Sequence, residues 1–113
     1  LYLILVARTF VALQEYDRAR KVLDMAEQIR KDLAKYERED EQGLGSYLMA
    51  YCYLALNDED KVFDHLENAL KANPERYLKK LKEDVNEPTS PLYTLKGDQR
   101  FDKLLKTYAS KSP

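Results

Sequence analysis

The sequence has few of the residues that mark many protein classes. Among 113 residues it has no tryptophan, one cysteine, one histidine, three glycines and four prolines. With Cys52 alone, no intrachain disulfide can form, and we expect this thiol to be buried on a helix. Nine tyrosines and many charges, with little glycine or proline, suit a soluble helical protein rather than a sandwich or a disordered chain. The length fits one domain with one modest core.

The sequence also lacks the residue sets that catalysis and metal binding need. His65 is the single histidine, and beside Asp64 and Glu67 we expect it on a charged helix face. A metal site would need more histidine or cysteine ligands than the chain has. No Ser–His–Asp or Cys–His set and no glycine-rich phosphate loop is visible. We therefore expect no enzyme activity, no metal and no cofactor.

Neither sign of charge dominates, and the first stretch is apolar but short. The net charge of −1 provides no global field that would attract nucleic acid, and no recognition motif is present, so we expect no nucleic-acid contact by this chain. The apolar run Leu1–Ala7 is far shorter than the roughly 20 residues that cross a bilayer, so we expect no membrane partner. A helix that is apolar on every side must be covered on every side. We expect preceding repeats or a second copy to cover it, as a homodimer through Leu1–Ala7.

The stretch 45–74 has the pattern of two amphipathic helices joined by a short turn. The first set of apolar residues at helical spacing is Met49, Ala50, Tyr53 and Leu56. Asn57 and Asp58 then interrupt the pattern, and both residue types favour turns and caps because their side chains bond nearby backbone N–H groups. The helical spacing resumes in a second set, Val62, Phe63, Leu66, Ala69 and Leu70. Pro74 follows, where proline commonly comes after a helix.

The same pattern occurs 43 positions earlier in the chain. Six positions carry matching apolar, small or aromatic residues: Val6, Ala7, Phe10, Leu13, Leu23 and Ala26. A single match would mean little, because alanine and leucine are common in helices. Two copies in register predict an internal helical repeat that covers about two-thirds of the chain.

This repeat resembles the tetratricopeptide repeat (TPR) family. Met49, Ala50 and Tyr53 match the apolar, small and aromatic residues of the family's first helix. The large apolar residue, the small crossing residue and the closing proline of its second helix are matched by Leu66, Ala69 and Pro74. Departures from the preferred tryptophan, glycine and alanine are Ser46, Asn57 and Val62. The resemblance implies an all-α fold of two TPR-like helical hairpins stacked as a superhelix, in the C-terminal part of a bacterial repeat array.

The repeat period exceeds the family's roughly 34 residues by about nine. The extra residues lie between Lys31 and Gly43, and the apolar face of the second helix continues into them. We expect about two additional turns on that helix, ended by Gly43 and Gly45. A longer helix exposed at its tip is the simpler interpretation, and an arm that contacts a partner is the alternative.

The residues after Pro74 predict capping helices. An apolar set at helical spacing predicts a short helix, namely Tyr77, Leu78, Leu81 and Val85. Two prolines predict a loop over 86–91, after which Leu92, Tyr93 and Leu95 are expected to fold back onto the repeats. Asp98 is expected to cap a last helix with the buried face Phe101, Leu104, Leu105 and Tyr108. The stretch 95–105 resembles the segment that closes many bacterial repeat arrays, with Gln99 where proline is usual.

The sequence thus divides into four parts: a first hairpin with an extended second helix (1–42), a second hairpin (43–74), C-terminal capping helices with a loop (75–110) and a tail (111–113).

The resemblance also implies a binding groove, because one stripe of each first helix forms the family's concave surface. That stripe comprises Ile4, Arg8, Val11, Leu44, Tyr47, Tyr51 and Leu54, with the small residues Ala12 and Ala55. Tyrosine and arginine are common interface anchors, and Arg8 can bind a carboxylate or stack on a tyrosine. The clamp by which chaperone-binding members hold a peptide C-terminus is absent, since Leu48 stands at an asparagine position. The alternative is that the C-terminal helices or preceding repeats fill the groove.

These features predict a non-catalytic scaffold that binds a protein or peptide, as part of a longer bacterial protein. The alternative is a regulatory or sensor domain of a larger protein, such as a peptide-responsive transcription regulator. The absence of a disulfide favours a cytoplasmic location and leaves an exported one open.

Overall fold

The computed structural model describes the backbone of residues 2–33 and 39–109, and the side chains of 3–32 and 42–109. These residues form α1 (Tyr2–Ala12), α2 (Tyr16–Leu33), α3 (Glu39–Ala55), α4 (Glu59–Ala72), α5 (Pro74–Val85), the short 3-10 helix η1 (Pro91–Leu95) and α6 (Gln99–Ala109). The described ranges contain no strand, which confirms the all-α class. None of their helices is long and apolar enough to cross a bilayer.

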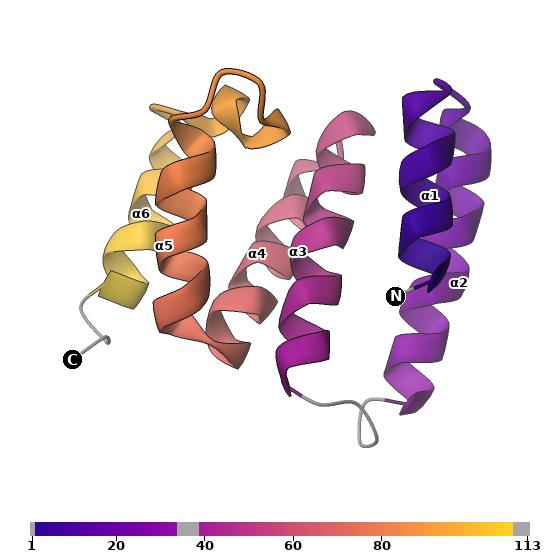
Figure 1. The fold of residues 1–113 in the computed structure, drawn as a ribbon, viewed down its shortest axis with the longest axis horizontal. Coiled ribbons are helices and arrows are strands. Elements are labelled where there is room, and N and C mark those ends of the chain that lie inside the picture. The colour runs from indigo at the N-terminus through magenta and orange to yellow at the C-terminus, as the bar shows by residue number, and fades with distance from the viewer. Residues whose placement is uncertain (1, 34–38, 110–113) are drawn as a thin grey trace.

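The helices pair in chain order into antiparallel hairpins (Figure 1). The first hairpin is α1 with α2, and the second is α3 with α4. In Figure 1, α1, α3 and α5 lie toward the viewer and α2, α4 and α6 lie behind them. The second hairpin is therefore covered on one side by the first hairpin and on the other by α5, η1 and α6.

The turns of the two hairpins are built alike. Gln14 lies just after α1 and has a φ of 60°, and Asn57 lies just after α3 and has a φ of 58°. In each turn the next backbone N–H returns to a carbonyl five residues earlier, from Glu15 to Phe10 at 2.9 Å and from Asp58 to Tyr53 at 3.0 Å. A positive φ explains why glycine suits this position, and asparagine tolerates it better than most residues. The two turns lie 43 residues apart, which is the spacing of the sequence repeat.

Most of the repeated apolar positions form the core, but Val6 and Phe10 are half-buried and Leu13 is 63% exposed. Five small or aliphatic residues predicted from the repeat are at most 3% exposed: Ala7, Ala50, Leu23, Leu66 and Ala69. Ala26 of the first copy, which corresponds to Ala69 of the second, is 3% exposed. Small side chains at these positions let the two helices of a hairpin approach closely. Cys52 is buried as expected.

The two glycines expected to end the second helix lie inside α3 instead. A Cβ on Gly43 would lie 2.7 Å from Cε2 of Tyr77, and one on Gly45 would lie 3.3 Å from Cζ of Arg30. Glycine is needed there because neighbouring side chains approach the backbone of α3, so the expected helix end at these residues is wrong. The boundary placed between residues 42 and 43 accordingly falls within α3, and residues 34–38 lie outside the described ranges.

The C-terminal segment largely follows its expectation. The backbone N–H of Phe101 donates to Oδ1 of Asp98 at 3.0 Å, which confirms the cap of α6. Phe101 and Tyr108 are buried, whereas Leu104 and Leu105 are only half-buried. Leu92 and Leu95 of η1 are buried, but Tyr93 is 40% exposed, because a 3-10 turn presents only one side to the core.

Candidate functional site

A groove of about 500 Å³ lies between α1, α3 and η1. We call it the α1–α3 groove, and it is lined by Arg8, Val11, Ala12, Tyr51, Cys52, Leu54, Ala55, Asn57, Pro91 and Thr94. Its walls are the facing sides of two first helices, which run parallel in Figure 1, and η1 closes one end. The volume lies in the range of ordinary ligand sites.

Six residues of the predicted stripe line this groove: Arg8, Val11, Ala12, Tyr51, Leu54 and Ala55. The other three do not. Ile4 is 1% exposed and Tyr47 is fully buried, so neither can touch a ligand, and both predictions are wrong. Leu44 is half-buried near the start of α3 and is not part of the lining.

Helix α5 explains why Tyr47 is covered. The Tyr47 ring lies 5.6 Å from the ring of Tyr77, and its hydroxyl donates to Asp84; both partners belong to α5. The alternative in which the C-terminal helices fill the stripe is therefore correct for this half. In the other half, η1 reaches the groove only through Pro91 and Thr94, which leaves the space between α1 and α3 open.

Tyr51 forms the centre of the open half and is held from three directions. Its hydroxyl donates to Oδ2 of Asp84 at 2.7 Å. Its ring packs edge-on against Tyr47, with 5.1 Å between centroids, and the guanidinium carbon of Arg8 lies 6.0 Å from its centroid. Burial, and then the hydrogen bond to Asp84, raise the pKa of Tyr51, so the phenol stays neutral. Burial raises the pKa of Cys52 to about 11, so its thiol also stays neutral.

The charge of the groove comes from one side chain. Among the described residues that line it, Arg8 is the charged side chain, and it is exposed. None of these described residues is a carboxylate, so nothing within the described lining neutralises this guanidinium. The groove offers apolar walls, one cation and a few hydrogen-bonding groups, and this combination suits binding of an extended, partly anionic ligand.

A second, polar cavity of about 450 Å³ lies between α2, α3 and α4, and sequence reasoning missed it. At its edge Glu27 accepts hydrogen bonds from the Tyr53 hydroxyl at 2.7 Å and from the Lys61 ammonium at 3.1 Å. His65 Nε2 lies 2.8 Å from the same carboxylate. We call these four residues the Glu27 cluster. It joins the first hairpin to both helices of the second.

His65 is therefore not on a charged surface as predicted. It is 8% exposed, and its ring stacks on Tyr53 with 5.4 Å between centroids. Burial lowers the pKa of His65 below its ordinary value, against the opposing effect of Glu27. Burial by itself would raise the pKa of Glu27, but the hydrogen bonds from Tyr53, Lys61 and His65 outweigh it and the pKa is lowered.

Arg30 braces the other side of this cavity. Its guanidinium donates to the backbone oxygen of Gln42 at 2.8 Å and to Oγ of Ser46 at 3.1 Å. These contacts tie α2 to the first turns of α3, which gives Arg30 a structural role. Within the described ranges, no group of three or more His, Cys, Asp or Glu side chains could hold a metal ion.

Comparison with known proteins finds no match for this chain among family models, curated proteins or solved structures.

Proposed function

We propose that the chain is a non-catalytic, TPR-like scaffold module that binds an extended peptide segment in the α1–α3 groove. The observation that carries this proposal is the groove itself, an open apolar channel in which Arg8 supplies a cation and no carboxylate belongs to the described lining. The ligand we propose is a segment that places a carboxylate beside an apolar side chain.

The repeat geometry supports the TPR-like part of the proposal. The turns after α1 and α3 have the same hydrogen bonds and the same left-handed residue, at Gln14 and Asn57. This left-handed position is where the family prefers glycine. Agreement at a strained backbone position is more specific than agreement between leucines, because few positions in a helical protein require a positive φ.

The groove supports the binding part. Val11 and Leu54 offer apolar walls to an entering side chain, and each Å² of apolar surface removed from water contributes roughly 25 cal/mol. Arg8 offers a planar guanidinium that binds a carboxylate through two parallel hydrogen bonds. Because Arg8 is exposed, the ion pair chiefly selects the ligand, and the apolar contacts supply most of the affinity.

Selection from a random peptide library displayed on phage tests this function. We expect enriched sequences that place Asp, Glu or the free C-terminal carboxylate next to a large apolar residue. Fluorescence titration of one enriched peptide should show at least about tenfold weaker binding to Arg8→Glu, because like charges placed opposite each other are strongly unfavourable.

Arg76→Glu is the matched control, since Arg76 is an exposed arginine outside the first hairpin that does not line the groove. The control should bind as the unchanged chain does. Leu54→Lys should abolish binding without unfolding the protein, because Leu54 is only half-buried. Enrichment without an acidic preference, or equal binding by Arg8→Glu, would show that this groove is not the site.

A further inference from the structure

Exposed apolar side chains concentrate in the first hairpin. Of the six large apolar residues that are exposed among the described side chains, five belong to it: Leu5, Leu13, Tyr16, Met25 and Ile29. The opposite end of the molecule differs, because α6 buries Phe101 and Tyr108 and presents polar residues to solvent. One end of the molecule thus presents a polar helix, and the other end carries exposed apolar side chains among its charges.

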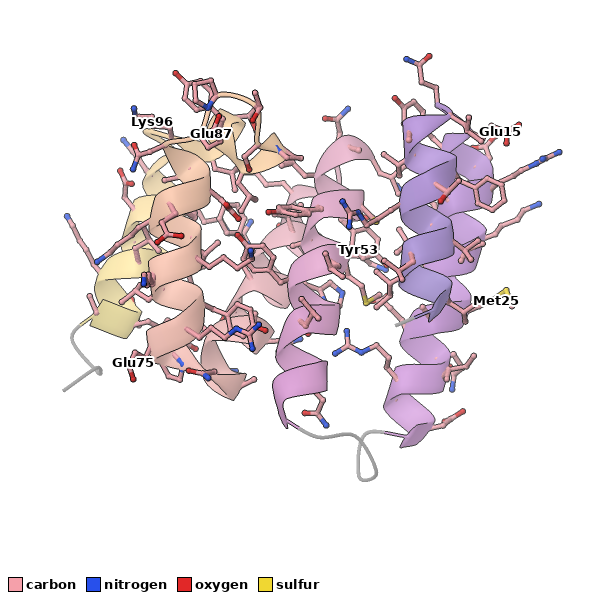
Figure 2. All side chains as sticks on the ribbon, viewed as in Figure 1. Glu15, Met25, Tyr53, Glu75, Glu87 and Lys96 are labelled. Atoms are coloured by element: carbon pink, nitrogen blue, oxygen red, sulfur yellow. The ribbon has the colours of Figure 1, made fainter. Side chains whose placement is uncertain are left out.

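On α2 the exposed Met25 and Ile29 and the half-buried Val22 form one stripe. Val22, Met25 and Ile29 follow one another at spacings of three and four, so they share one side of the helix. Met25 is 55% exposed and points away from the rest of the molecule (Figure 2). We call these three residues the outer face.

The outer face also changes the expectation of a homodimer through Leu1–Ala7. Ile4 and Ala7 are buried within the chain and Leu3 and Val6 are half-buried, which leaves Leu5 as the exposed large residue of that run with a described side chain. Most of the free apolar surface therefore lies on α2 rather than α1, because the second hairpin already covers one side of α1.

We infer that the outer face binds a second copy of this chain, with the two α2 helices antiparallel about a two-fold axis at Met25. The charges along α2 support this occupant. Arg18 and Asp32 lie seven residues before and after Met25, and both are exposed. An antiparallel pairing at Met25 places Arg18 of each copy opposite Asp32 of the other, so both charge pairs form at once.

Existing contacts of these charges do not oppose the pairing. Arg18 is 3.5 Å from Glu15 in an exposed pair, and Asp32 accepts from the side-chain amide of Gln28 at 3.3 Å. Both are contacts between neighbours on the surface, of a kind that contributes little. The pairing also places Lys21 opposite Ile29, where the lysine stem can cover the isoleucine while its ammonium remains in water.

The size of the end face fits a stable dimer. The end formed by the first hairpin is bounded by the two shorter dimensions of the molecule, 33 and 20 Å, so its cross-section is at most about 660 Å² per copy. Specific interfaces bury roughly 600–1,000 Å² per partner, so a stable dimer would cover most of this end.

Sedimentation equilibrium over a wide concentration range tests this interface. The unchanged chain should be a dimer, and Met25→Glu should be a monomer, because it brings two carboxylates together on the two-fold axis. Tyr93→Glu is the matched control, since it changes an exposed aromatic residue outside the first hairpin, and it should remain a dimer. Circular dichroism should show that all three chains are folded, because the changed side chains are exposed.

Charge reversal tests the antiparallel arrangement separately. Arg18→Asp alone and Asp32→Arg alone should each raise the dimer dissociation constant about tenfold or more, since each creates two pairs of like charges. The double variant Arg18→Asp with Asp32→Arg should recover the original constant. A monomeric unchanged chain would overturn the dimer, and a double variant as weak as the single ones would overturn the pairing at Met25.

Discussion

Replacing Glu27 with alanine should remove one of the polar links between the two hairpins. Glu27 stands on α2, and its three partners stand on α3 and α4. Tyr53 is fully buried and His65 is 8% exposed, so neither can turn to solvent when the carboxylate is removed. Lys61 is far more exposed and can return to water.

The expected loss follows from these exposures. A buried donor left without an acceptor costs about 1–3 kcal/mol, and the variant leaves two of them, on Tyr53 and His65. The exposed ion pair between Lys61 and Glu27 contributes at most about 1 kcal/mol, so it is not counted in the expected loss. Since His65 borders an open cavity that water can enter, we expect a total near the lower end, about 2–4 kcal/mol. For a domain of this size that corresponds to a melting temperature lower by about 8–16 °C.

Thermal unfolding followed by circular dichroism at neutral pH measures this loss. Asp24→Ala is the control, because it removes an exposed carboxylate from the same helix and should change stability by no more than about 0.5 kcal/mol. The melting temperature of Tyr53→Phe should lie between those of Glu27→Ala and Asp24→Ala, because Glu27 keeps two of its three donors. If Glu27→Ala melts together with Asp24→Ala, the Glu27 cluster does not hold the hairpins together.

Two further predictions concern the same core. Below neutral pH the protein should lose stability, because folding lowers the pKa of both His65 and Glu27. The unfolded chain therefore binds more protons than the folded chain once the pH falls below 6.5, the ordinary pKa of the imidazole, and again below 4.5, the ordinary pKa of the carboxyl. A urea midpoint that stays constant from pH 7 to pH 4 would contradict this. Ala69→Leu should cost about 1–3 kcal/mol by overpacking the close contact of α3 and α4, and an unchanged melting temperature would argue against that contact.

The core positions could be predicted from the sequence because they depend on local spacing. Once two segments share a pattern of small and large residues, each helix must turn that side toward its neighbour. Leu23 and Leu66 are therefore equally buried although they are 43 residues apart. The turn positions were also readable, since Asn57 is a common residue for a left-handed helix end.

The glycines of α3 show where local rules fail. In sequence, Gly43 and Gly45 have the appearance of a helix end, because glycine is a poor helix former. In the structure their missing side chains make room for Tyr77 and Arg30, which come from other helices. A requirement imposed by distant side chains has no local signature, so the sequence alone favoured the wrong interpretation.

For the same reason, the residues of the predicted stripe differ from those that line the observed groove. The spacing of a helix places Tyr47 and Tyr51 on one side of α3, but it cannot say how far the returning chain covers that side. Asp84, more than thirty residues later, decides the question by accepting both hydroxyls. The Glu27 cluster was missed because its members likewise come from three separate helices.

The position of Asp84 also bears on how the groove would bind. Its carboxylate fixes the Tyr51 hydroxyl, Tyr47 supports the edge of the Tyr51 ring, and Arg8 lies over the ring. A side chain held at three points loses little conformational entropy when a ligand packs on it, so less of the contact energy is spent on ordering the site. Helix α5 therefore does more than cover the second hairpin, because its Asp84 holds in place the aromatic residue at the centre of the groove.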